Sequence, residues 1–292
     1  MHTDDVLTDA AQVRRLVAAQ FPEWADLPLT PVAEFGTDHW LYRLGDELVI
    51  RMPRIGWAVD QAESDQRWLP VLAPHLPLAV SEPVALGQPG EGYPYPWLVV
   101  RWLPGENPRD DNVDLARAAV DLAEFVVALQ KIDPAGGPRA SGTSRGAPLE
   151  NLADTVDEHL AVLDGEIDGS RARKVFALGL EAGPWPGDGA WLHGDLQAGN
   201  LLVRNRRLTA VIDFGCLAVG DPAPDYAPAW SLFTGESRRS FRQSSGVDDA
   251  TWARARAWTM IPALTGLPYY RDTVPAFAEM ARYRLGQVLA DV

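Results

Sequence analysis

The residues best suited to chemistry gather in one stretch, WLHGDLQAGNLLVRNRRLTAVIDFG at 191–215. Asp195 lies five residues before Asn200, and Asp213 follows Asn200 after thirteen more. Amide and carboxylate oxygens are hard ligands, which Mg²⁺ prefers together with phosphate oxygens. The spacing is typical of phosphoryl transfer, in which the first acid meets a substrate hydroxyl and the later amide and acid bind metal. We therefore predict that Asp195 is catalytic and that Asn200 and Asp213 bind Mg²⁺.

The segment between the two predicted metal ligands favours a hairpin. The apolar runs LLV and LTAVI flank a polar turn at 205–207. Because the ends of a hairpin meet, we expect Asn200 and Asp213 to be neighbours in space, with Asp195 just upstream on a loop bounded by Gly194.

The elements that position these residues fall into two regions. Residues 9–20 predict a short amphipathic helix, and 30–52 a β-meander with tight turns. A helix is expected over 60–69, ended or kinked by Pro70, and two more strands over 83–86 and 97–103.

After Pro104 the pattern becomes helical, first over 112–131, and it stays mostly helical except near 188–216. We predict an α+β fold of two lobes, a small β-rich lobe at 1–103 that covers a nucleotide and a larger helical lobe at 104–292.

Charge and composition exclude several classes of protein. Forty acids and 26 bases give a net charge of −14, which argues against a nucleic-acid partner and favours a cationic one. The segment 101–168 alone carries −8. The single cysteine, Cys216, excludes an internal disulfide. With neither a signal peptide nor an apolar run of membrane-spanning length, we expect a cytoplasmic protein.

The segment HGDLQAGNLLV, with VIDFG and the run DPAPDYAPAW at 221–230, resembles the aminoglycoside phosphotransferase family. These antibiotic kinases share the protein-kinase-like fold, and the resemblance covers roughly residues 30–290. Gln197 departs from the His or Gly of many relatives. No APE-type segment follows, which argues against a protein kinase.

The resemblance implies that the N-terminal lobe covers ATP or GTP. Residues 34–44 look like its loop between the first two strands, with Gly36 as the single glycine. Residues 99–102 resemble the hinge between the lobes, where backbone groups, including those of Val100 and Trp102, would contact the purine. The two nucleotides are not distinguished by such contacts.

In place of the family's phosphate-pairing lysine, the third strand carries Arg51, with Arg54 as a rival. Arginine holds phosphate oxygens bidentately, and some macrolide-type relatives also use it. An acid on the next helix would orient this cation. We favour Glu63 over Asp60 and Asp65.

Further roles are expected for residues near the chemical stretch. We expect His193 to orient the loop and Asp225 to brace it, and Cys216 to be a small packing residue. The aromatic segment 267–273 either lines the acceptor cleft or packs the last helices.

The implied reaction is transfer of a γ-phosphoryl group, with Mg²⁺, to a hydroxyl of a cationic, aminoglycoside-like antibiotic. The alternatives are a macrolide kinase, a metabolic kinase of an amino sugar or amino alcohol, and, more remotely, a nucleotide-binding regulator without turnover. The oligomeric state stays open.

Overall fold

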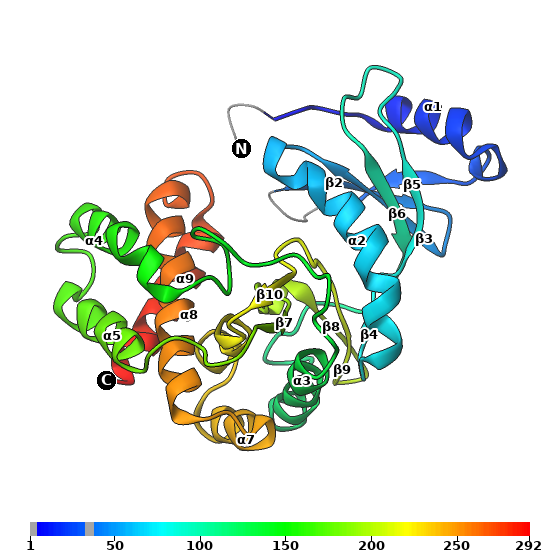
Figure 1. The fold of residues 1–292 in the computed structure, drawn as a ribbon. Coiled ribbons are helices and arrows are strands. Elements are labelled where there is room, and N and C mark those ends of the chain that lie inside the picture. Colours follow the sequence, from blue (N-terminus) through cyan, green and yellow to red (C-terminus); the bar gives the residue numbers. More distant parts are fainter. Residues whose placement is uncertain (1–4, 33–37) are drawn as a thin grey trace. The chain divides into compact units, whose positions relative to one another are not determined.

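A computed structural model describes residues 5–32 and 38–292 (Figure 1). It has the expected α+β character, with a β-sheet in the N-terminal region and mostly helices in the C-terminal region. Two compact units divide the chain. Unit 1 comprises residues up to Pro74, Ala79–Pro104 and Ala210–Gly215, and unit 2 comprises His75–Leu78, Gly105–Thr209 and Cys216–Val292. The assignment of functional domains at residue 103 stays a prediction.

Unit 1 is built on a five-stranded antiparallel sheet with the order β1-β2-β3-β6-β5. The predicted meander and the two later strands are present, and the last of them ends at Arg101 rather than Leu103. The strands are β1 (Leu29–Pro31), β2 (His39–Leu44), β3 (Leu48–Pro53), β5 (Pro83–Gly87) and β6 (Trp97–Arg101).

Two helices pack on different sets of side chains of this sheet. Residues of α1 (Ala10–Gln20) join a core with Ile50 and Met52, whereas α2 (Val59–Leu72) contributes Ala62 to a core with Val49. Successive side chains of a strand point to opposite faces. Arg51 therefore shares the face of Val49, which is the face that α2 covers.

Helix α2 does not end at Pro70, although an end there was one of the two outcomes that the sequence predicted. It continues to Leu72, and Leu69 and Leu72 are fully buried. Pro70 stands in the last turn, where its missing N–H removes a single helical hydrogen bond. Burial of the two leucines outweighs that loss.

The predicted hairpin is present at the centre of the chemical stretch. Strand β8 (Leu201–Arg204) leads through Asn205 and Arg206 into β9 (Arg207–Val211). Both turn residues have positive φ, 52° and 64°, as a type I′ turn requires. Ala210 and Val211, the end of β9, pair in parallel with β4 (Ala79–Val80) inside unit 1.

Unit 2 contains a two-stranded antiparallel pair, β7 (Ala190–Leu192) with β10 (Ala218–Gly220), among helices. Helix α8 packs against α4, α5 and α9, and α3 against α7 and β7. Among the residues that the structure describes, no helix is long and apolar enough to span a bilayer. The helices are α3 (Leu115–Gln130), α4 (Ala153–Val162), α5 (Gly169–Glu181), α6 (Pro228–Ser231), α7 (Gly235–Ser245), α8 (Asp249–Tyr270) and α9 (Pro275–Ala290).

Candidate active site

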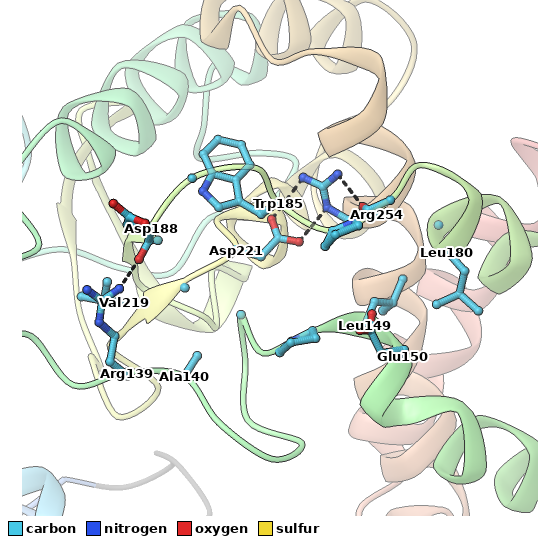
Figure 2. A pocket seen from close by; sticks show the side chains of 18 residues that line it. Arg139, Ala140, Leu149, Glu150, Leu180, Trp185, Asp188, Val219, Asp221 and Arg254 are labelled. Carbon is cyan, nitrogen blue, oxygen red and sulfur yellow. Dashed lines mark hydrogen bonds and ion pairs between the residues drawn. The ribbon is translucent and has the colours of Figure 1, made fainter.

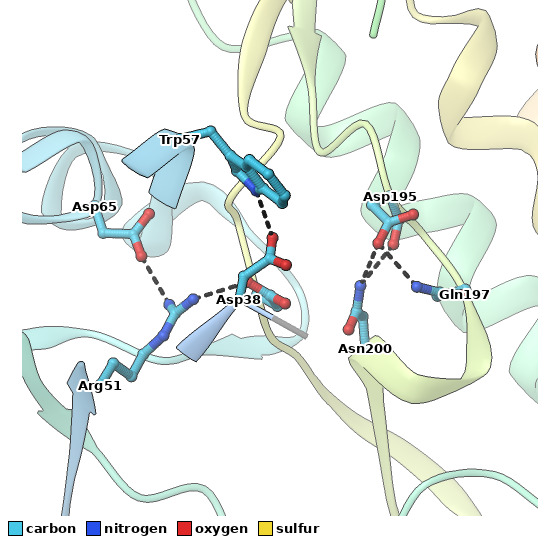
Figure 3. Close-up of polar contacts among 8 residues, drawn as sticks. Asp38, Arg51, Trp57, Asp65, Asp195, Gln197 and Asn200 are labelled. Atoms are coloured by element: carbon cyan, nitrogen blue, oxygen red, sulfur yellow. Dashed lines mark hydrogen bonds and ion pairs between the residues drawn. The ribbon is translucent and has the colours of Figure 1, made fainter. Parts of the chain in front are cut away.

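The loop that follows β7 holds the predicted catalytic acid between two amides (Figure 3). Gln197 Nε2 donates to Asp195 Oδ2 over 2.8 Å, and Asn200 Nδ2 donates to the same oxygen over 3.1 Å. Asn200 Nδ2 also donates to the backbone carbonyl of Asp195 over 2.8 Å. One carboxylate oxygen is thus fixed by the protein, and within the described residues no donor contacts the other, Oδ1.

A buried carboxylate fixes the start of this loop. Asp225, on the 3-10 turn Ala223–Tyr226, accepts the backbone N–H of His193 over 2.8 Å and that of Gly194 over 2.7 Å. Burial raises the pKa of Asp225 to about 6, although His193 and the two N–H donors favour its charged form. His193 Nδ1 in turn accepts the N–H of Asp195 over 3.2 Å. The predicted bracing and orienting contacts of Asp225 and His193 are confirmed.

Gly194 is required for steric reasons. Its φ is +81°, and a Cβ at this position would lie 2.7 Å from the carbonyl oxygen of Cys216 and 3.0 Å from Cβ of Arg145. A side chain would therefore push the loop away from its neighbours.

Cys216 itself is exposed, so the expectation that it is a small packing residue was wrong.

Asn107, which no sequence pattern marked, holds the other end of the loop. Its Nδ2 donates to the carbonyl oxygens of Gly199 over 2.8 Å and Leu201 over 3.0 Å, on either side of Asn200. Asn107 lies in a Pro/Gly-containing connection with no distinctive spacing to the chemical stretch. Only the fold brings it to this loop.

In unit 1, Arg51 binds two acids at once. Its Nη1 donates to Asp65 Oδ2 and its Nη2 to Asp213 Oδ1, both over 2.8 Å. Burial alone would lower the pKa of Arg51, but the carboxylates of Asp213 and Asp65 outweigh it and raise that pKa. The guanidinium is therefore a fixed positive charge. The side chain of Asp65 is buried, whereas that of Asp213 is 45% exposed.

Asp65 is the orienting acid, and the preference for Glu63 was wrong. Side chains 62, 65, 69 and 72 of α2 are buried, at the spacing of one helix face. Glu63 points away from that face and is exposed. Arg54, the rival cation, is engaged elsewhere, because it pairs with Asp5 over 2.6 Å and stacks on Trp40 at 4.0 Å.

The other predicted nucleotide contacts are placed only in part. Gly36 lies outside the described residues. Val100 is buried and pairs with Val49 in the sheet. The backbone N–H of Trp102 donates to the carbonyl of Glu47 over 2.7 Å, so it is not open to a purine. The hinge role of Trp102 therefore rests on its carbonyl, and both hinge contacts stay predictions.

The donor set fits a hard cation. The side-chain amide nitrogen of Asn200 donates hydrogen bonds to Asp195, which leaves the amide oxygen as the atom that could bind a metal. Asp213 has a left-handed backbone, φ 63°, an unusual conformation that positions its carboxylate on Arg51. Asn200 belongs to unit 2 and Asp213 to unit 1, so their shared metal stays a prediction. In the described ranges, no cluster of three His, Cys, Asp or Glu side chains suits a metal.

Unit 2 also contains a cavity of about 280 Å³ (Figure 2). Its wall includes Trp185 and the buried pair of Arg254 Nε and Asp221 Oδ2, 2.7 Å apart. Gly189, which precedes β7, lines it, whereas Asp195 follows the other end of that strand. The lining also includes Val219 and Gly220 of β10, the strand that pairs with β7, and it does not include Asp195.

Comparison with known proteins identifies the class. The profile described as the phosphotransferase enzyme family matches residues 30–258. The chain belongs to this family. No curated protein sequence gives a significant match.

Several solved structures share the fold at low identity. The GDP complex of wild-type aminoglycoside 2′-phosphotransferase IIIa superposes with a TM-score of 0.74 at 19% identity, over 97% of this chain and 99% of that one. A macrolide 2′-phosphotransferase from Brachybacterium faecium gives 0.63 at 24% identity, over 95% and 97%. The ternary complex of streptomycin, ATP and APH(2″)-IIa gives 0.59 at 16% identity, over 98% and 97%. These likenesses confirm the fold class and leave the acceptor open.

Proposed function

We propose that the protein transfers the γ-phosphoryl group of ATP or GTP to a hydroxyl of a small-molecule antibiotic of the aminoglycoside type. Membership of the phosphotransferase family supports the reaction class. The observation that carries the proposal is the Asp195 carboxylate. One of its oxygens is fixed by two amides, and the other is left for a hydroxyl.

Asp195 orients the acceptor hydroxyl and accepts its proton as the bond to phosphorus forms. Because Oδ2 is fixed by Gln197 and Asn200, the carboxylate cannot rotate freely, and Oδ1 keeps one direction. Positioning of this kind is the main contribution of a protein to phosphoryl transfer.

Arg51 is the cation that we propose for the nucleotide phosphates. Two of its five N–H groups are used by Asp65 and Asp213, so the guanidinium keeps donors for phosphate oxygens. Asn200 and Asp213 are the residues we propose to hold Mg²⁺. When bound, the ion neutralises phosphate charge.

The preference for a cationic acceptor rests on charge. The chain carries −14, and the segment 101–168 alone −8. A negative potential of this kind attracts ammonium groups and speeds their encounter.

A macrolide is the second candidate, and a feature beside Asp195 favours it. Arg284 is buried, and the charges of Asp195 and Arg145 both act on its guanidinium. Burial, together with Arg145, lowers the pKa of Arg284, and Asp195 opposes the shift. A buried cation that interacts with the catalytic acid suits an acceptor with a single amine better than a polycation.

The reaction is tested with a panel of aminoglycosides, macrolides and amino alcohols, incubated with ATP or GTP and read by mass spectrometry for an added phosphate. Asp195→Ala should lower turnover by ~10²–10⁴-fold and leave nucleotide affinity nearly unchanged. Asp188→Ala, which removes an exposed acid, is the matched control. If Asp195→Ala keeps more than about a tenth of the turnover, the catalytic assignment is wrong.

Salt separates the two acceptor classes. Exposed charges are screened beyond ~8 Å at physiological ionic strength, so the KM of a polycationic acceptor should rise clearly with salt. The KM of a macrolide should change little. If the best acceptor is neutral or insensitive to salt, the aminoglycoside preference fails while the kinase chemistry stands.

A further inference from the structure

Arg284 differs from the other buried arginines of the described chain. Arg51, Arg54 and Arg254 each have a carboxylate oxygen within 2.8 Å. Arg284, on α9, is 6% exposed, yet in the described residues its side-chain partner is the neutral amide of Gln197 and no carboxylate lies within ion-pair distance. Its Nε is buried without a hydrogen-bond partner there. A buried cation without a direct counter-ion is costly, which calls for a reason to keep it.

Within the described residues, the side chain of Arg284 makes one hydrogen bond, and it leads to the catalytic acid. Its Nη2 donates to Gln197 Oε1 over 3.4 Å, and Gln197 Nε2 donates to Asp195 Oδ2 over 2.8 Å. The charge of Asp195 also acts on Arg284 directly. The three side chains therefore form one line from α9 to the loop after β7.

Hydrogen-bond chemistry fixes the orientation of the Gln197 amide between Arg284 and Asp195. A glutamine side chain has an oxygen that only accepts and an NH₂ group that only donates. A guanidinium only donates, so it selects the oxygen end of Gln197. The NH₂ end must then face Asp195, where a carboxylate needs a donor.

We propose that Arg284 is a positioning residue for phosphoryl transfer, which sets the amide of Gln197 and through it the direction of the Asp195 carboxylate. The inference rests on the proposed function of Asp195. Without Arg284, Gln197 can turn its oxygen toward Asp195, and the repulsion between the two oxygens would rotate the carboxylate away from the acceptor.

The test compares Arg284→Met, Arg284→Lys, Gln197→Ala and the double variant Arg284→Met with Gln197→Ala. Arg284→Met should lower kcat by ~10–100-fold, with KM for nucleotide within about twofold of the wild-type value, because the loss is one of orientation. Arg284→Lys keeps a cationic donor and should recover part of that loss. The double variant should be no slower than the slower single variant, because both act on one contact.

A matched control contacts the same helix from α7 (Gly235–Ser245). Arg238 Nη2 donates to Gln287 Oε1 of α9 over 2.7 Å, and Nε of Arg238 is likewise buried without a partner in the described chain. Arg238→Met removes an arginine–glutamine contact of α9 that does not involve the catalytic loop. It should leave kcat within about twofold of wild type.

A readout without turnover separates this proposal from the proposed function. The side-chain amide signal of Gln197 in a ¹⁵N–¹H spectrum, assigned by its loss in Gln197→Ala, should shift in Arg284→Met and stay in place in Arg238→Met. If the wild type phosphorylates no acceptor, the proposed function fails, and the amide signal still decides the contact. An unmoved signal in Arg284→Met, an unchanged kcat, or additive losses in the double variant would each overturn the positioning role.

Discussion

Arg51 and Asp213 are 162 residues apart in the chain, and an ion pair of 2.8 Å joins Nη2 of one to Oδ1 of the other. The same guanidinium holds Asp65 of α2. The proposed phosphate cation, its orienting acid and a proposed metal ligand are therefore one network inside unit 1. A substitution at any of the three residues should therefore alter the hydrogen bonds and side-chain positions of the other two.

Removing the orienting acid tests this network. Asp65→Ala should lower the free energy of unfolding by ~3 kcal/mol, because it leaves a nearly buried guanidinium with one carboxylate in place of two. Nucleotide KM should rise as Arg51 loses its fixed orientation. Glu63→Ala, an exposed position on the same helix, is the control and should change stability by less than ~0.5 kcal/mol. Urea unfolding measures both, and equal effects of the two variants would refute the assignment of Asp65.

The shape of the cation at position 51 should matter as well as its charge. Arg51→Lys should keep part of the activity and Arg51→Ala much less, since only arginine donates to both acids and to phosphate in fixed directions. The observables are kcat and the KM for ATP and GTP. Arg54→Ala should destabilise the protein through Asp5 and leave the nucleotide KM unchanged. Near-wild-type behaviour of both Arg51 variants would move the phosphate cation elsewhere.

Nucleotide should stabilise the protein in a metal-dependent way. A ligand at ~100 times its Kd adds ~2.7 kcal/mol to the stability of the folded state. Thermal melts with ATP or GTP, with and without Mg²⁺, should show this shift in the wild type, and Asp213→Ala should lose most of the part that depends on Mg²⁺. Asp249→Ala, at a fully exposed acid, serves as control. The absence of any shift with either nucleotide would contradict the kinase assignment.

His39 should make the protein sensitive to mild acid. Burial first, and then the charge of Arg51, lowers the pKa of this histidine from 6.5 to about 3. Between these two values the unfolded chain binds a proton that the folded protein excludes, so the stability that neutral His39 permits is present above pH 6.5 and is lost as the pH falls. The slope for one proton is at most ~1.4 kcal/mol per pH unit.

His39→Gln removes the titrating group and should flatten this part of the stability profile. Urea unfolding at pH values from 4 to 7 compares the variant with the wild type, so that contributions of Asp65 and Asp225 cancel in the difference. A difference curve that does not depend on pH would show that His39 is not held neutral by the fold.

Local sequence patterns predicted many of the residues of the candidate site. The third strand marked Arg51 as the candidate phosphate cation, and the order of Asp195, Asn200 and Asp213 indicated the family before any fold was known. Helix α2 was harder, because it offers three acids within six residues. The choice depends on which face the sheet buries, and only the packing of Ala62 and Leu69 beside Asp65 decides it.

The residues that escaped prediction act over long separations. Asn107 contacts a carbonyl 92 residues away, and Arg284 contacts Gln197 at a separation of 87. Neither has a periodic or motif-like relation to its partner. Such side chains acquire their roles from tertiary structure, so a single sequence marks them as ordinary polar residues.

The single thiol of the chain provides a built-in place for a probe. Cys216 is exposed, and its backbone lies so close to Gly194 that no side chain fits between them. A fluorophore or spin label attached there needs no engineered cysteine and no removal of competing ones, because the sequence has no other. Movements of the loop that begins at His193 could be followed in the otherwise unaltered protein while it binds nucleotide and acceptor.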